Sequence, residues 1–157
     1  MAINYGKAFE KKFYDDFKKL EGSSIDRLYD TTMGYKSISQ ISDFVAYIYP
    51  NILYIECKTH AGSSFPLSNL TQYDKLIDKV GIKGVRAGVI LWFYEKDVDI
   101  IYVPISTFKK LKEDSKKSFN IKMIDDGTYP SVRCPSKKRR TFYDTDYSVL
   151  SQLPEGW

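Results

Sequence analysis

The pattern of apolar and polar positions divides the chain into alternating helical and extended segments. Three phenylalanines and a leucine recur at helical spacing over residues 5–20, and Gly22 follows as a stop signal, which predicts an amphipathic helix. Residues 41–58 (ISDFVAYIYPNILYIECK) instead predict two apolar strands around a turn at Pro50-Asn51.

The remaining segments continue this alternation. Residues 87–94 (AGVILWFY) are almost entirely apolar, which is typical of a central strand covered on both faces. The pattern further predicts an irregular polar stretch at 23–40, a loop at 62–68, a helix at 69–80, a strand at 100–103 and a helix at 106–115. This order predicts one α/β domain over residues 1–157, with a central mixed β-sheet flanked by helices.

Three charged residues interrupt the apolar hairpin. Because side chains alternate along a strand, Glu56 and Lys58 share one face and Cys57 points to the other. If the loop is Pro50-Asn51, or any loop of even length centred there, Asp43 lies opposite Lys58. Asp43 and Glu56 are then diagonal neighbours, about 7–8 Å apart at the backbone. A loop of odd length would break this parity.

Two carboxylates this close repel each other, and a divalent cation would supply the missing positive charge. The chain has one histidine, His60, and two cysteines, so a metal site must be built from oxygen ligands, which favours Mg²⁺ or Mn²⁺. Near a metal and a phosphate, Lys58 can orient an attacking water or neutralise developing charge. The simpler interpretation is a surface hairpin with a cross-strand Asp–Lys pair. A lone loop histidine seldom has a catalytic role, so His60 is left out of the site.

The net charge of +4 hides an uneven distribution. Residues 1–108 hold 13 basic and 13 acidic side chains, whereas residues 109–140 hold 11 basic and 4 acidic ones. This basic C-terminal region ends in Lys137, Lys138, Arg139 and Arg140, and such clustering suits a polyanion such as nucleic acid. The alternative is a solvated helix followed by a loop.

Hydropathy argues against a membrane protein. No segment approaches the roughly 18–20 consecutive apolar residues that a membrane span requires. The first residues lack the apolar core of a signal peptide. We therefore expect a cytoplasmic protein with no membrane partner.

The arrangement Ser42-Asp43 … Glu56-Cys57-Lys58 resembles the PD-(D/E)xK nuclease superfamily. More narrowly, the chain resembles RecU-type Holliday junction resolvases, especially their compact phage-type members. The resemblance is carried by GKAFE (6–10), SDF (42–44), IECK (55–58) and SSFPLSNLTQYDKL (63–76), and it continues through 81–93 and 143–153. It implies a restriction-endonuclease-like fold, a homodimer, Mg²⁺ that Mn²⁺ can replace, and symmetric nicking of four-way DNA junctions in recombination and repair.

The resemblance also assigns residues. Asp43 and Glu56 match the metal-binding acids, and Lys58 matches the motif lysine. Glu10 matches the acidic residue of the first helix, and Gln72 matches the polar residue of the second. Glu10 could equally be an ordinary exposed residue.

Other residues keep alternatives open. Gln72 could merely close a capping box with Asn69. Arg27 and Asp30 could approach the site or form a salt-bridged strand end, and the second is the simpler interpretation. Longer RecU-type members carry a stalk before the catalytic aspartate, whose counterpart here is a short projecting segment at about 29–41.

The expected DNA contacts follow from these segments. Tyr35 and Lys36 would enter the open centre of a junction, by stacking and phosphate contact. Residues 137–140 would hold duplex arms through their phosphates. The resulting expectation is a structure-selective endonuclease that resolves four-way junctions. The alternatives are a sequence-specific restriction-type endonuclease and a catalytically inactive DNA-binding protein on the same fold.

Overall fold

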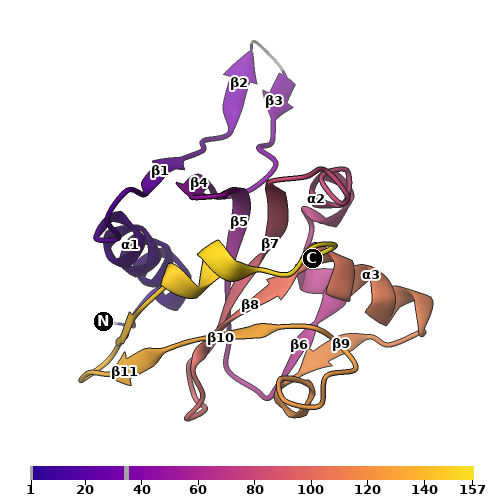
Figure 1. The fold of residues 1–157 in the computed structure, drawn as a ribbon. Helices are drawn as coiled ribbons and strands as arrows, with labels where there is room; N and C mark the ends of the chain where they lie inside the picture. Colours follow the sequence, from indigo (N-terminus) through magenta and orange to yellow (C-terminus); the bar gives the residue numbers. More distant parts are fainter. Residues whose placement is uncertain (1, 34–35) are drawn as a thin grey trace.

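The computed structural model of the chain describes residues 2–33 and 36–157 (Figure 1). Its main sheet contains strands β1 (Ser24–Arg27), β4 (Phe44–Ile48), β5 (Asn51–His60), β7 (Val85–Phe93), β8 (Ile100–Pro104) and β10 (Val132–Cys134). The helices are α1 (Tyr5–Lys18), α2 (Tyr73–Ile77) and α3 (Ile105–Glu113).

Three small ladders stand outside this sheet. They pair β2 (Thr31–Met33) with β3 (Lys36–Ile38), β6 (Ser64–Pro66) with β9 (Ser118–Asn120), and β11 (Ser136–Lys138) with β12 (Tyr143–Thr145). Short 3₁₀ turns are η1 (Leu67–Asn69), η2 (Ile121–Met123) and η3 (Ser148–Gln152). The β2–β3 hairpin extends away from the rest of the molecule at one end (Figure 1).

The main sheet is mixed, as predicted. Its strand order is β1-β4-β5-β7-β8-β10, with β5 and β7 parallel and every other neighbouring pair antiparallel. All of β7 except its first residue is buried, which confirms that the apolar stretch forms a central strand covered on both faces. The expected α/β fold with helices flanking a mixed sheet is therefore confirmed.

Two apolar cores cover the two faces of the sheet. On one face, Phe9, Phe13 and Phe17 of α1 pack against the inward side chains of β4 and β5, such as Phe44. The other face packs against α2 and α3 through a second cluster that includes Phe108. The helical spacing of the α1 phenylalanines thus determines which face of β4 and β5 the helix covers.

The register of the β4–β5 hairpin differs from the prediction. Phe44 pairs with Ile55 and Ile48 with Asn51, so the two-residue turn is Tyr49-Pro50 rather than Pro50-Asn51. Asn51 joins the strand because its side chain is buried, and its amide donates to the Leu150 carbonyl at 3.0 Å. Because the turn still has two residues, the same side chains share a face as predicted. Each residue of β4, however, pairs with a residue of β5 two positions earlier than predicted.

Three other predicted segments were also wrong in part. The polar stretch 23–40 contains β1, β2 and β3 rather than irregular chain, because β1 adds an edge strand to β4 while burying only Ile25. The helix expected over 69–80 is confined to α2 and preceded by η1. Part of the loop expected at 62–68 pairs as β6 with β9.

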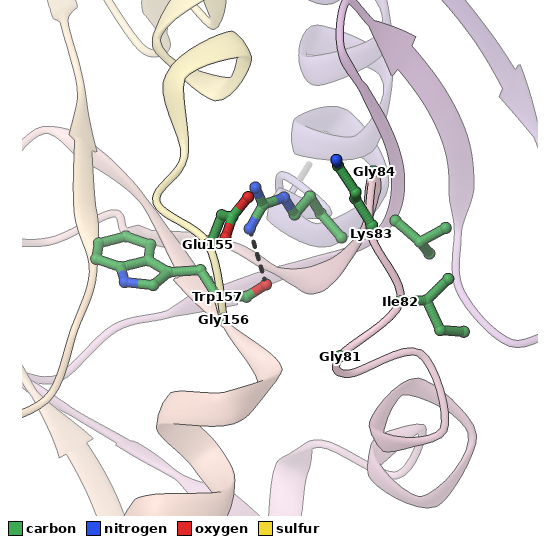
Figure 2. A pocket seen from close by; sticks show the side chains of 9 residues that line it. Gly81, Ile82, Lys83, Gly84, Glu155, Gly156 and Trp157 are labelled. Atoms are coloured by element: carbon green, nitrogen blue, oxygen red, sulfur yellow. Dashed lines mark hydrogen bonds between the residues drawn. The ribbon is translucent and has the colours of Figure 1, made fainter.

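The C-terminal segment is held against the sheet by a buried arginine. Arg86 donates to Asn51 Oδ1 at 3.1 Å and to the carbonyl oxygens of Leu153, at 3.1 Å, and Trp157, at 3.3 Å. A pocket of about 190 Å³ lies between residues 81–86 and 155–157, and Figure 2 shows the side chains that line it. The hydrogen bonds of Arg86 to a polar side chain and to main-chain carbonyls compensate the burial of its guanidinium group.

Within the described part of the chain, no helix is long and apolar enough to cross a membrane.

Candidate active site

Two carboxylates meet where β4 begins. Continuing the observed register by one residue places Asp43 directly opposite Glu56, not opposite Lys58 as predicted. The main-chain N–H of Asp43 donates to Glu56 Oε2 at 3.1 Å, and the N–H of Cys57 donates to Asp43 Oδ2 at 2.8 Å. The reciprocal bonds fix both carboxylates on facing strands, closer together than the diagonal arrangement would have put them.

The two acids line a polar pocket of about 260 Å³. Its wall comes from the end of β1, the chain around the base of the β2–β3 hairpin, and α2. The lining residues are Arg27, Leu28, Tyr29, Asp30, Gln40, Ser42, Asp43, Glu56 and Gln72. Segments distant in the sequence therefore converge on the acidic pair.

Burial perturbs both acids. The side chain of Glu56 is 3% exposed, and desolvation together with the charge of Asp43 raises its pKa from 4.5 to about 7. Desolvation also raises the pKa of Asp43, although the hydrogen bond from the Cys57 N–H opposes this. Neighbouring buried carboxyls with raised pKa values are expected where a bound cation would supply compensating charge.

Lys58 completes the acidic pair. Its Nζ lies 3.1 Å from Glu56 Oε1, and its side chain is 24% exposed. The lysine and Glu56 emerge on the same face of β5, as the alternation predicted. The amine therefore stands beside the acids with access to solvent.

Glu10 reaches the site from α1 but is held by a partner. Its carboxylate forms an ion pair with Arg27, the last residue of β1. The charge of Glu10 raises the pKa of Asp43, whereas the charge of Arg27 lowers it. Arg27 is thus a salt-bridged strand end, as the simpler interpretation had it, and it also lines the pocket.

Gln72 lies in the pocket wall, and the alternative of a capping box is wrong. It is the N-cap of α2, its side chain makes no capping bond, and its Oε1 accepts a hydrogen bond from Thr71 Oγ1 at 3.0 Å. Helix α2 begins at Tyr73, so Asn69 is not an N-cap. Asp30 links the two ends of the β2–β3 hairpin, because its Oδ1 accepts a hydrogen bond from the Gln40 N–H at 2.8 Å.

The expected DNA-binding residues lie away from the pocket or outside the described chain. Tyr35 lies outside the described residues, and Lys36 starts β3. Figure 1 shows β11, which carries Lys137 and Lys138, at the end of the molecule opposite the β2–β3 hairpin. Arg139 pairs with Asp144 at 2.6 Å, and Arg140 is exposed. The structure thus separates this basic cluster from the acidic pair.

His60 remains apart from the acids at the far end of β5. Its ring makes edge contacts with Phe65 and Phe93, at centroid distances of 6.1 and 6.3 Å. These aromatic contacts give the histidine a packing role.

The donor set suits a magnesium ion better than an ion that needs a full protein cage. Among the described residues, no three His, Cys, Asp or Glu side chains form a candidate metal cluster. Mg²⁺ binds commonly through only one or two carboxylates, keeping waters and substrate phosphates as its other ligands. Asp43 and Glu56 provide such a pair of neighbouring carboxyl groups.

Comparison with solved structures identifies the fold. Archaeoglobus fulgidus Hjc, a Holliday junction resolvase from an archaeal hyperthermophile, superimposes with a TM-score of 0.55 and 22% sequence identity, covering 82% of this chain and 95% of Hjc. The chain shares the fold of Hjc. Neither family models nor curated proteins match its sequence. This fold is restriction-endonuclease-like, as expected, while the narrower RecU-type resemblance stays a prediction.

Proposed function

We propose that the chain is a Mg²⁺-dependent endodeoxyribonuclease that resolves four-way DNA junctions in recombination and repair, of the RecU type. The observation that carries the proposal is the pair of Asp43 and Glu56 in one polar pocket, with Lys58 Nζ 3.1 Å from Glu56 Oε1, in a fold shared with a Holliday junction resolvase. These are the same three residues that make up the sequence motif.

The residues have separate roles in this proposal. Asp43 and Glu56 would hold Mg²⁺, or Mn²⁺ in its place, and the ion supplies Lewis-acid stabilisation of the scissile phosphate and a more acidic water. Lys58 would donate a hydrogen bond to the attacking water or to a phosphate oxygen, adding positive charge where negative charge develops. Gln72 would orient the DNA or the water from the pocket wall. Hydrolysis would leave a 5′-phosphate and a 3′-hydroxyl.

Glu10 and Arg27 would position this machinery. Their ion pair lies beside Asp43, and the charge of Arg27 favours the ionised form of that acid. Ionised Asp43 is the form that binds a cation. The pair therefore acts on the metal site through the protonation of Asp43.

Junction selectivity would come from the β2–β3 hairpin. It projects from the sheet near the start of β4, and its base is tied by the Asp30–Gln40 bond and by Lys75, whose Nζ donates to the Ser39 carbonyl at 2.6 Å. A fixed projection beside the pocket suits entry into the centre of a branched DNA. The residues 137–140, at the opposite end, would hold duplex arms.

A substrate panel tests the proposal. Purified protein is offered a mobile four-way junction, a duplex, a flap and single strands, each with Mg²⁺, Mn²⁺ or EDTA. We expect cleavage of the junction alone, and only with metal. Sequence-defined cuts in linear duplex would instead indicate a restriction-type enzyme, and metal-independent binding without cleavage would indicate an inactive DNA-binding protein.

Two variants test how DNA is selected. Replacing residues 34–36 by Gly-Ser-Gly should reduce the preference for junction over duplex and spare nonspecific binding. Neutralising residues 137–140 should weaken binding to both DNAs equally and flatten its salt dependence. Equal effects of the two variants on a junction and a matched duplex would contradict this division of roles.

A further inference from the structure

A second pocket, of about 490 Å³, lies beside the one that holds the acidic pair. Helix α1 forms one side of it, and the end of β1 with the start of β4 forms the other; Figure 1 shows β1 between α1 and the β2–β3 hairpin. Its lining residues are Lys11, Tyr14, Asp26, Arg27, Tyr29 and Phe44. Because three of these side chains are aromatic, we call it the aromatic pocket. The chemistry proposed above uses neither of its tyrosines.

The aromatic rings and the arginine form one connected surface. The Tyr14 ring packs against that of Phe44, with ring centroids 6.1 Å apart and 28° between the planes. The Arg27 guanidinium lies over Phe44 and over Tyr29, at 5.4 and 5.9 Å from the ring centroids. Phe44 is fully buried, whereas Tyr14 is half-buried and Tyr29 is 68% exposed. Of the three rings, the two tyrosines are therefore the ones that can present a surface to a ligand.

The aromatic pocket is continuous with the candidate active site. Both pockets have Arg27 and Tyr29 in their walls. Arg27 pairs with Phe44 across β1 and β4, and the following N–H, that of Leu28, donates to the Asp43 carbonyl at 2.8 Å. Phe44 and Asp43 are consecutive, so their Cα atoms are about 3.8 Å apart and their side chains point to opposite sides of the strand. A nucleotide next to a phosphate bound at the acids is thus within reach of the aromatic pocket.

The charges around the aromatic pocket favour an uncharged ligand. Lys11 forms an ion pair with Asp15 at 2.7 Å, and Arg27 forms one with Glu10. Asp26 adds a further acid to the lining. Cations that already have acidic partners, beside another carboxylate, give little attraction for a phosphate. A nucleobase is uncharged and planar, and every base has a face that stacks on an aromatic side chain.

We propose that the aromatic pocket takes a nucleobase displaced from the branch point of the DNA, next to the scissile phosphate, and stacks it against Tyr29 and Tyr14. The inference deepens the proposed function and rests on it, because it takes branched DNA to lie at the acidic pair. A base at a branch point has lost a stacking neighbour, so that its removal from the helix costs less than in a continuous duplex. Capture of such a base would favour a junction over a duplex.

Photocrosslinking tests the placement of the base without requiring cleavage. Iodouracil replaces single bases, one position at a time, across the branch point of a four-way junction and in the middle of one arm. The wild type is bound to each junction in EDTA and irradiated, and mass spectrometry identifies the crosslinked residue. We expect crosslinks to Tyr29 or Tyr14 from adjacent positions at the branch point and none from the arm. Branch-point labels that crosslink only to other residues, or not at all, would overturn the proposal.

Substitution of the exposed tyrosine tests the energetic contribution of stacking. Tyr29→Leu should weaken junction binding in EDTA by about 5–150-fold, the effect of losing one stacked base, and leave duplex binding unchanged. Tyr29→Phe keeps the ring and should bind the junction as the wild type does. Tyr49→Leu is the matched control, because Tyr49 is 78% exposed at the other end of β4, and it should also bind normally. Unchanged junction binding by Tyr29→Leu, or an equal loss for junction and duplex, would contradict base capture.

An abasic junction tests the contact between ring and base. Removal of the base at the crosslinked position should weaken binding by the wild type and have little effect on binding by Tyr29→Leu, because both changes remove the same contact. Equal losses for the two proteins would mean that the ring and the base do not touch, which would overturn the proposal.

The outcomes separate this inference from the proposed function. A protein that crosslinks to the branch point through Tyr29 but cuts no junction in Mg²⁺ or Mn²⁺ would refute the nuclease and keep the aromatic pocket. A protein that cuts junctions with metal, and whose Tyr29→Leu variant binds them as the wild type does, would keep the nuclease and refute the aromatic pocket.

Discussion

The substitution Glu56→Gln should stabilise the metal-free protein at alkaline pH. Glu56 is buried beside Asp43, and its pKa is raised to about 7. A carboxyl whose pKa is higher in the folded than in the unfolded chain makes the folded state bind the extra proton. The free energy of unfolding of the wild type should therefore fall as the pH rises from about 4.5 to 7, and stay low above it.

The magnitude follows from the pKa. The difference between 4.5 and about 7 corresponds to about 3 kcal/mol at most, at 1.36 kcal/mol for each tenfold change in proton affinity. This pKa already contains the contact with Lys58, which lowers it, and the figure is an upper bound because solvent near the partly exposed lysine screens the charge. We expect a net gain of about 2 kcal/mol at pH 8 in EDTA, or about 4–8 °C in melting temperature.

Urea unfolding at several pH values measures this effect. Wild type and Glu56→Gln should be nearly equal at pH 4.5 and diverge by pH 8, whereas Glu21→Gln, at an exposed position, should follow the wild type throughout. Mg²⁺ should stabilise the wild type at pH 8 and have little effect on Glu56→Gln, because a bound cation compensates the same charge. A variant less stable than the wild type at pH 8 would refute the reasoning that Glu56 is held at an electrostatic cost.

Three further substitutions test the roles given to Lys58, Arg27 and Arg86. Lys58→Ala should keep metal affinity, measured by calorimetry, and lower the cleavage rate by about 10²–10³, and an equal loss of affinity would make Lys58 structural. Arg27→Met should move the acidic limb of the pH–rate profile to higher pH, because Arg27 lowers the pKa of Asp43; an unmoved limb would contradict that link. Arg86→Ala should destabilise the fold by about 3 kcal/mol in urea unfolding, since it leaves Asn51 and buried carbonyls without their donor; a loss below about 1 kcal/mol would contradict the clamp.

The strong apolar patterns predicted most of the layered fold. Helix α1 and strand β7 were predictable because each buries a long stretch with a clear period. The strand β1 was not, because it buries only Ile25 and forms by pairing with β4. Helix α2 was predicted too long, since its apolar residues also fit the turns on either side of it.

The sequence also predicted which of the candidate site residues share a face, but not their register. The motif predicted that Asp43, Glu56 and Lys58 share a face, and they do. It could not predict that Asn51 would join β5, because that follows from a distant contact with the Leu150 carbonyl. The sequence left the role of Arg27 open for a similar reason, since its partner on α1 is close only in the folded chain.

Ligation of the cleavage products tests the central claim most directly. A four-way junction and a duplex with the same arm sequences are incubated with wild type or Asp43→Asn in Mg²⁺, and DNA ligase is then added. We predict paired symmetric nicks in the junction alone, sealed by ligase because they carry a 5′-phosphate and a 3′-hydroxyl, and none with Asp43→Asn. An intact junction in Mg²⁺ and Mn²⁺, equal cutting of the duplex, or undiminished cleavage by Asp43→Asn would contradict it.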